Sequence, residues 1–279
     1  MKKIIVFVSA LLLVVTLVGC GKKEAVFDFE KGVLVVGMEA DYPPFNWYES
    51  DSTEFNVKLE SGGYVDGYDV QIAKLIAEEL EMELVIKALD WKHLISALRF
   101  GDIDLIIAGM SPTEERKESI NFTTPYYSSN HIVVVKRDGQ FANITSLADL
   151  ESARGVGQIN TIYAELVDYV VEHHGATANP VRDSVGLMVL DILNDDADFM
   201  VVETPVALLY EASHPNLKLL FQDAGNIFNV SDEERDVSIG VRKGDTLLLE
   251  KLNLALAEIS LEMRNQIMSE VSLRAEIDE

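Results

Sequence analysis

The amino-acid sequence predicts an α/β fold, and three observations support this prediction. Short apolar runs that are typical of buried strands recur along the chain, at residues 32–38, 104–108 and 199–202. Segments with apolar residues at helical spacing alternate with these runs. Several runs end at loops rich in Gly, Pro or acidic residues, and ligands bind beyond the carboxyl ends of strands in parallel sheets. The 279 residues suffice for one large domain or two smaller ones.

The composition is that of a globular protein with a strong excess of acidic residues. Asp and Glu total 47, Lys and Arg total 23, and the net charge is −24. This charge argues against nucleic-acid binding, and it would repel anionic lipid headgroups, so we expect any membrane tether to be covalent. Solubility explains most of the acidity. The single cysteine excludes an intrachain disulfide, and the five histidines lack metal-ligand spacing, so we expect neither metal nor cofactor.

The N-terminal sequence resembles a lipoprotein signal peptide. Two lysines precede an apolar run of about fifteen residues, which is short for a membrane span and suits a signal core. Residues 17–20, Leu-Val-Gly-Cys, resemble a bacterial lipobox. We therefore expect a signal peptide over residues 1–19, lipidation of Cys20, a tether over residues 20–32, and a location at the extracytoplasmic face of the cell membrane. An uncleaved N-terminal anchor is the alternative.

Residues 104–127 contain the most informative segment. The buried run breaks near Gly109, and a polar helical turn follows that Ser111 or Thr113 could cap. Free amides at a helix start, with the nearby guanidinium of Arg116, suit a carboxylate. The carbonyl of Gly109 suits an ammonium group, so this segment could bind both charged ends of a free amino acid. The alternative reading of Arg116 is a solvated residue on a surface helix.

The stretch IIAGMSPTEERKESINFTTPYY, residues 106–127, closely resembles a segment of solute-binding proteins of polar amino-acid ABC transporters, family 3 of the bacterial extracellular solute-binding proteins. The resemblance runs in order through most of the chain after residue 32. It implies a type II periplasmic-binding-protein fold with a two-stranded hinge, lobe 1 comprising residues 33–128 plus 238–279 and lobe 2 residues 129–237. It also implies closure around a ligand in the interlobe cleft and docking on permease subunits. We expect a monomer.

The resemblance places further site residues on lobe 1. The loop that follows the first strand carries Glu39 and Tyr42, and Trp91 begins the second helix. Residues 48–63 form an acidic insertion that we interpret as a solvated hairpin. Asp69 is the expected N-cap of the first helix.

On lobe 2, residues 155–162 resemble the family's second anion-binding turn. Asn160 stands where the family usually has Gly, and Asn tolerates the left-handed backbone that such a turn requires. The resemblance implies that the Thr161 hydroxyl and the Ile162 amide bind the ligand carboxylate. It also implies that Glu203 binds the ammonium group, although a Glu at a helix start could merely favour the dipole. Further helices are expected at residues 163–174, 184–194, 246–263 and 265–275.

The charge count suggests the ligand. The charges of Arg116 and Glu203 balance the carboxylate and ammonium groups of an amino-acid ligand. Glu39 is then an unmatched carboxylate near the aromatic Trp91, and Asp41 is a second candidate. A spare carboxylate and an aromatic face favour a cation. We therefore predict a basic free L-amino acid, arginine ahead of lysine or ornithine, with a polar neutral ligand such as glutamine or cystine as runner-up. Two other classes are an enzyme resembling cyclohexadienyl dehydratase, for which we find no nucleophile–base pair, and a sensor or adhesion module.

Overall fold

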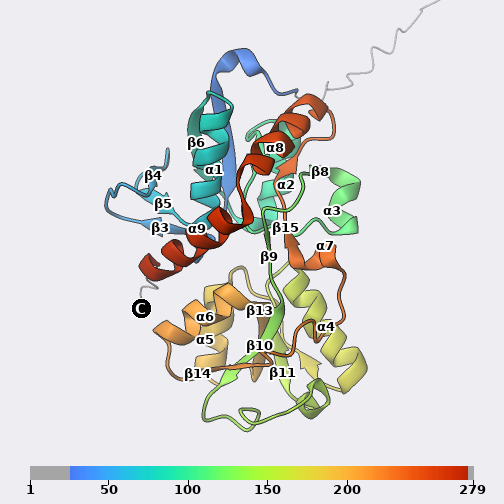
Figure 1. Ribbon diagram of the computed structural model, residues 1–279. Helices are drawn as coiled ribbons and strands as arrows, with labels where there is room; N and C mark the ends of the chain where they lie inside the picture. Colours follow the sequence, from blue (N-terminus) through green and yellow to red (C-terminus); the bar gives the residue numbers. More distant parts are fainter. Residues whose placement is uncertain (1–25, 276–279) are drawn as a thin grey trace, which may run out of the picture.

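The computed structural model describes residues 26–275, which form two α/β lobes stacked one above the other in Figure 1. This arrangement confirms the predicted two-lobed fold. The predicted signal peptide, Cys20 and the first residues of the predicted tether lie outside the described residues. Among residues 26–275, no helix combines the length and apolar character that a membrane crossing requires.

Lobe 1 is built on a five-stranded sheet in the order β6-β1-β7-β16-β8. The inner strand β1 pairs parallel with β6 and β7, and its Leu34 and Val36 are fully buried. Helices α1 and α2 pack on the sheet, and α8 and α9 pack on α1. The bounds are β1 (Val33–Met38), β6 (Glu83–Ala88), β7 (Leu105–Ile106), β8 (Asn121–Phe122), β16 (Gly240–Val241), α1 (Tyr68–Glu79), α2 (Leu94–Phe100), α8 (Thr246–Glu258) and α9 (Leu261–Arg274).

Lobe 2 is built on a second five-stranded sheet in the order β12-β11-β13-β10-β14, against which α4, α5 and α6 pack. The strand β10 is buried along most of its length, as its run of Ile and Val predicts. The bounds are β10 (His131–Lys136), β11 (Arg154–Val156), β12 (Thr177–Ala178), β13 (Phe199–Glu203), β14 (Leu217–Leu220), η3 (Leu147–Leu150), α4 (Ile162–His174), α5 (Val185–Leu193) and α6 (Thr204–Ser213).

Two chain crossings join the lobes. The chain enters lobe 2 through β9 (Tyr127–Ser128) and returns through α7 (Asp232–Arg235) and β15 (Asp236–Val237). The strands β9 and β15 pair antiparallel and form the two-stranded hinge (Figure 1).

The predicted insertion forms part of a small sheet at the edge of lobe 1, in the order β2-β3-β5-β4. Phe55 fastens it to lobe 1, because Gln71 and Lys74 donate to its carbonyl and the guanidinium of Arg274 lies 4.5 Å from its ring. The same sheet holds Tyr42 beside the interlobe cleft. The bounds are β2 (Asp41–Tyr42), β3 (Asn46–Glu49), β4 (Val57–Lys58) and β5 (Tyr64–Asp66).

Predicted helix ends were wrong at the start of α1 and at the junction of α8 and α9, where the helix expected over residues 265–275 begins at Leu261. Asp69 is not the N-cap of α1, since Gly67 holds that position and Asp69 lies buried in the first turn, where Asn46 and Tyr126 donate to its carboxylate. The expected helix over residues 246–263 ends early, at Glu258. It stops because the next helix begins at Leu261, with the side chain of Ser260 accepting from the backbone N–H of Met263.

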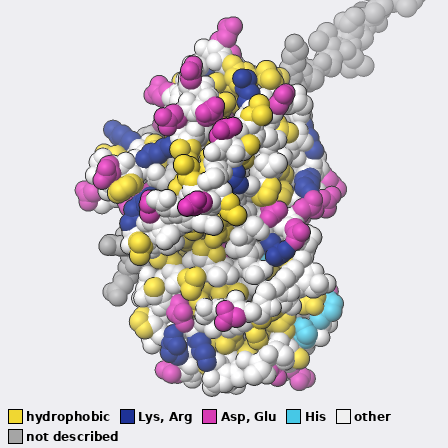
Figure 2. All heavy atoms as spheres, in the orientation of Figure 1, with side chains coloured by type: hydrophobic (Ala, Val, Ile, Leu, Met, Phe, Trp, Pro, Cys, Tyr) yellow, Lys and Arg dark blue, Asp and Glu magenta, His cyan; other side chains and the backbone are white. Residues whose placement is uncertain are grey.

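The N-terminal described residues pack on lobe 1. A short 3-10 helix, η1 (Phe29–Lys31), precedes β1, and Phe27 is buried with its N–H donating to Asp245 at 2.8 Å. On the face seen in Figure 2, acidic side chains are spread over both lobes and are interspersed with Lys and Arg. This distribution agrees with a charge that serves solubility.

Candidate functional site

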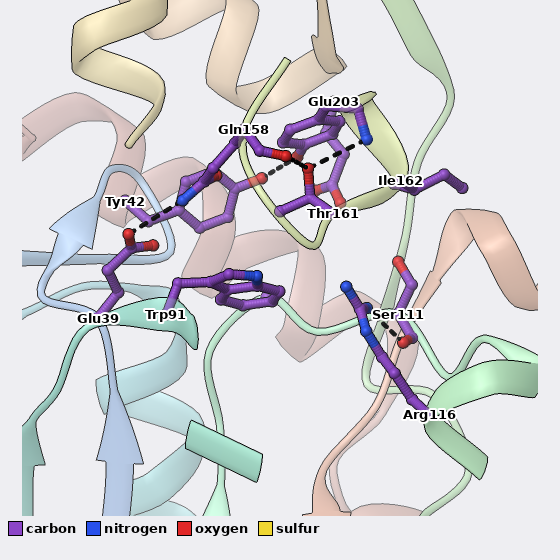
Figure 3. Close-up of a pocket in the computed structure, with 11 residues that line it drawn as sticks. Glu39, Tyr42, Trp91, Ser111, Arg116, Gln158, Thr161, Ile162 and Glu203 are labelled. Atoms are coloured by element: carbon purple, nitrogen blue, oxygen red, sulfur yellow. Dashed lines mark hydrogen bonds between the residues drawn. The ribbon is translucent and has the colours of Figure 1, made fainter. Parts of the chain in front are cut away.

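The nine residues predicted for the site all line one cavity between the lobes, together with Gln158 and Tyr163. Loops that follow strands of lobe 1 supply one wall, and the start of α4 and the end of β13 supply the other (Figure 3). The nine are Glu39, Tyr42, Trp91, Gly109, Ser111, Arg116, Thr161, Ile162 and Glu203.

Arg116 is held in a defined orientation by backbone oxygens. It belongs to α3 (Glu114–Ser119), which Thr113 caps. One guanidinium nitrogen donates to the Ser111 carbonyl at 2.8 Å, and another reaches across the cleft to the Asn160 carbonyl at 3.0 Å. The guanidinium also lies 5.2 Å from the ring of Trp91. Burial lowers the pKa of Arg116 to about 10, so it is charged at neutral pH.

Gly109 has a left-handed backbone, with φ of 61°. A Cβ atom at this position would lie 2.6 Å from Cε1 of Tyr42. Only glycine therefore lets the backbone approach Tyr42 this closely at the edge of the cavity.

The start of α4 forms the facing wall. Asn160 has φ of 57°, which confirms the left-handed turn expected there. Thr161 is the N-cap, and its hydroxyl accepts from the N–H of Tyr163 at 3.2 Å and donates to the carbonyl of Gln158 at 2.8 Å. Ile162 is the first helical residue, so its N–H has no partner within the helix. This N-terminus offers free amides and a positive dipole end to an anion.

Glu203 lies at the end of β13 with only 2% of its surface exposed, and one of its carboxylate oxygens is buried without a hydrogen-bond partner. Burial and the charge of Asp69 raise its pKa to about 8. The hydroxyls of Tyr42 and Tyr163 lie against this carboxylate and hydrogen bond to each other across the cleft. Their hydrogen bonding to Glu203 favours its ionised form but offsets only part of the increase in its pKa. A carboxylate in this setting lacks a cationic partner.

Glu39 lies at the other end of the cavity from Arg116, with Trp91 between them in Figure 3. Trp91 begins the 3-10 helix η2 (Trp91–His93) and donates from its indole to the Asn160 carbonyl at 3.1 Å. Gln158 donates to the Glu39 carboxylate at 3.0 Å. Burial and the charge of Asp41 raise the pKa of Glu39 to about 8. Asp41 itself lines an adjoining hollow that also borders Glu39 and Trp91.

Sequence reasoning missed Gln158 and Tyr163. Gln158 lies within the turn that was singled out, and its side chain joins the two lobes through Glu39. Tyr163 follows Ile162, and its ring turns back towards Tyr42. Their positions on either side of Thr161 were the only available signal. Within residues 26–275, no three His, Cys, Asp or Glu side chains lie close enough to hold a metal ion.

An ionic cavity between two hinged α/β lobes defines the class of solute-binding receptors with the type II periplasmic-binding-protein fold. The model of the bacterial extracellular solute-binding proteins, family 3, matches residues 34–270, and the chain belongs to this family. It is therefore an extracytoplasmic solute-binding protein of an amino-acid ABC transporter.

Relatives with described ligands are found among both sequences and structures. The arginine-binding extracellular protein ArtP of Bacillus subtilis is 31% identical over 260 residues, which is 93% of each chain. The structure of an ancestral arginine-binding protein bound to arginine gives a TM-score of 0.70 at 31% identity, covering 86% of this chain and 97% of the other. An ancestral amino acid-binding protein described as a precursor of cyclohexadienyl dehydratase gives 0.70 at 25% identity, covering 86% and 95%.

Proposed function

We propose that the protein binds a free basic L-amino acid, arginine ahead of lysine or ornithine, in the interlobe cavity and delivers it to the permease subunits of an ABC transporter. The observation that carries the proposal is the charge of the cavity wall. One fixed cation, Arg116, is accompanied by two carboxylates, the half-buried Glu39 and the buried Glu203, which lie apart from each other. A guest with one anionic and two cationic groups matches this set.

The wall suggests one orientation for arginine. Its α-carboxylate pairs with the guanidinium of Arg116 and with the backbone amide of Ser111 on lobe 1. It also meets the backbone amide of Ile162 at the capped start of α4. Its ammonium group meets Glu203 and the carbonyl of Gly109. Each charge-assisted hydrogen bond contributes about 1.5–3 kcal/mol. Because these groups lie on different lobes, the ligand stabilises the closed state.

The ligand side chain would run over Trp91 to Glu39, which lies beyond that ring in Figure 3. The indole face favours a guanidinium, and the Glu39 carboxylate can accept two of its hydrogen bonds. A neutral side chain such as that of glutamine would leave Glu39 without a cation. Two relatives described above bind arginine, and this similarity supports the same ligand class.

Isothermal titration of residues 21–279 with the twenty amino acids tests the proposal. We expect arginine to bind most tightly, and Glu39→Gln to weaken arginine about tenfold or more, the loss of one charged contact. The same variant should leave glutamine binding nearly unchanged. Glu78→Gln, which alters an exposed carboxylate of lobe 1, is the matched control. Tight binding of glutamate or glutamine without binding of arginine would reject the proposal.

The proposal includes anchoring through a lipid on Cys20. Detergent phase partition of the full chain expressed in a bacterium tests this part. The wild type should enter the detergent phase, and Cys20→Ser should remain in the aqueous phase or as uncleaved precursor. Equal partition of both proteins at the same apparent mass would contradict lipidation.

A further inference from the structure

We propose that Asp69, which does not line the cavity, is a positioning residue that fixes both the ammonium end and the side-chain end of the ligand site. The inference rests on the proposed function, because it assumes a ligand with an α-ammonium group. Its basis is a pair of hydrogen-bond chains that start from one buried carboxylate and reach two separate parts of the cavity wall.

Asp69 lies in the first turn of α1 and has no exposed surface. The ion pairs among the described residues do not include it. Its carboxylate accepts instead from two neutral donors, the hydroxyl of Tyr126 at 2.6 Å and the side-chain amide of Asn46 at 2.7 Å. A buried carboxylate without a cationic partner is costly, so a stability role alone explains it poorly.

The first chain leads to the ammonium end. Tyr126 donates to Asp69 and accepts from the backbone N–H of Gly109 at 3.3 Å. These two bonds point the same way, so each polarises the other. They hold the backbone at Gly109, whose carbonyl is proposed to accept from the ligand ammonium.

The second chain leads to the side-chain end. Asn46 donates to Asp69, and its carbonyl oxygen accepts from the backbone N–H of Ala40 at 2.7 Å. Ala40 directly follows Glu39 and has φ of 60°, a conformation that a residue with a Cβ adopts only when its surroundings hold it. Asp69 thereby supports the turn that directs Glu39 into the cavity.

Asp69 also acts through its charge. Its carboxylate is close enough to Glu203 to contribute to the raised pKa of that group. An ammonium group at Glu203 and Gly109 would therefore experience two negative charges. A ligand in which a hydroxyl replaces the ammonium would gain nothing from the second charge.

The test compares L-arginine with its α-hydroxy analogue, argininic acid, which keeps the carboxylate and the guanidinium. Dissociation constants are measured by isothermal titration at about pH 8.5, where Asp69, with a pKa of about 7, is ionised. We expect the wild type to prefer arginine, and Asp69→Asn to reduce that preference at least about fivefold. Asp66→Asn is the matched control, because Asp66 is also buried but pairs with Arg274 at 2.6 Å. It should keep the wild-type preference.

The outcomes separate this inference from the proposed function. If Asp69→Asn leaves the preference for arginine over argininic acid at the wild-type value, the role at the ammonium end is overturned. If it weakens neither ligand, the support of Glu39 is overturned as well, and in both cases the proposed function stands. If the wild type binds another amino acid rather than arginine, the ratio is measured with that amino acid and its hydroxy acid. If Asp69→Asn fails to fold, Tyr126→Phe, which removes only the hydroxyl, is tested instead. The ratio of its dissociation constants for arginine and argininic acid then decides the inference. A wild type that binds none of the twenty amino acids overturns both proposals.

Discussion

Individual side chains of the site are held ready before any ligand arrives. The Ser111 carbonyl, which lies in the same lobe, holds the guanidinium of Arg116 in place, so a ligand carboxylate does not have to order a free side chain. Such preorganisation reduces the entropic cost of binding.

Replacing Arg116 should therefore remove a charged, geometrically matched contact. We expect Arg116→Ala to weaken arginine binding by about 100-fold or more, since two charge-assisted hydrogen bonds contribute about 1.5–3 kcal/mol each. Arg116→Lys should recover only part of the loss, because a lysine cannot form the two-pronged pair. Lys117→Ala, which removes exposed surface pairs with Glu114 and Glu233, serves as the control in the same titration. Equal affinities for all four proteins would contradict this role.

The two carboxylates of the cavity make binding depend on pH. Their pKa values of about 8 exceed the ordinary value of 4.5, so the empty folded protein holds protons that the unfolded chain has lost. The stability of the empty protein should therefore fall as pH rises from about 5 to about 8. A cationic ligand favours the ionised carboxylates, so binding at neutral pH should release protons and strengthen as pH rises.

Titration of arginine in two buffers of different ionisation enthalpy measures this release directly, and thermal melts across the same pH range measure the stability. Glu39→Gln should lower the number of protons released. Proton uptake, or a melting temperature of the empty protein that rises over this range, would contradict the sign of the prediction.

Residue-level prediction from sequence succeeded where a local motif fixes a side chain. Arg116 and Ser111 belong to one turn, so their proximity follows from the chain itself. Asp69 was misassigned, because its partner Tyr126 is remote in sequence and only the packed lobe brings the two together. The placement of the nine expected residues around one cavity depended on a resemblance, and their contacts with a ligand remain a prediction.

At the scale of elements, the position of the α4 N-terminus depends on Gly157. A Cβ on Gly157 would lie 2.5 Å from Cα of Ala164 and 2.7 Å from its backbone nitrogen. The helix therefore approaches the end of β11 more closely than any side chain permits. Predicted helix ends agreed with the structure at Gly175, where a left-handed glycine stops α4, and failed near Ser260, where a competing cap starts a new helix.

Gly157→Ala should push the start of α4 away from the cavity. We expect a loss of arginine affinity of about tenfold together with a destabilisation of about 1–3 kcal/mol, the usual cost of overpacking. Gly244→Ala is the matched control, because a Cβ added at Gly244 would meet no atom within 4 Å and its backbone is unstrained. Titration and urea unfolding of both variants test this. Wild-type affinity in Gly157→Ala would show that α4 tolerates the shift.

For the whole molecule, the alternation of strands and helices predicted the class of fold, and the resemblance predicted the hinge. The contacts across the cleft could not be predicted, because they depend on how far the lobes close. The indole of Trp91 reaches the Asn160 carbonyl, and Gln158 reaches Glu39, so the lobes touch through the walls of the cavity.

Closure should be visible in tryptophan fluorescence. The chain has two tryptophans, Trp47 in β3 and Trp91 in the cleft. We expect arginine to change the emission of the wild type and of Trp47→Phe, because Trp91 passes into the closed cleft. Trp91→Phe should lose most of the change while still binding arginine, although more weakly. If Trp47→Phe lost the arginine-dependent change in emission and Trp91→Phe kept it, closure of the lobes at Trp91 would be contradicted.

The order of strands in lobe 1 has a consequence for synthesis. Every strand of the lobe 2 sheet lies within residues 131–220, so that sheet can assemble as soon as this stretch has left the ribosome. In lobe 1, β16 separates β7 from β8, and it comes from residues 240–241. The lobe 1 sheet, whose first strands are synthesised early, therefore remains incomplete until β16 has been made. Its unpaired strand edges can aggregate until nearly the whole chain has emerged.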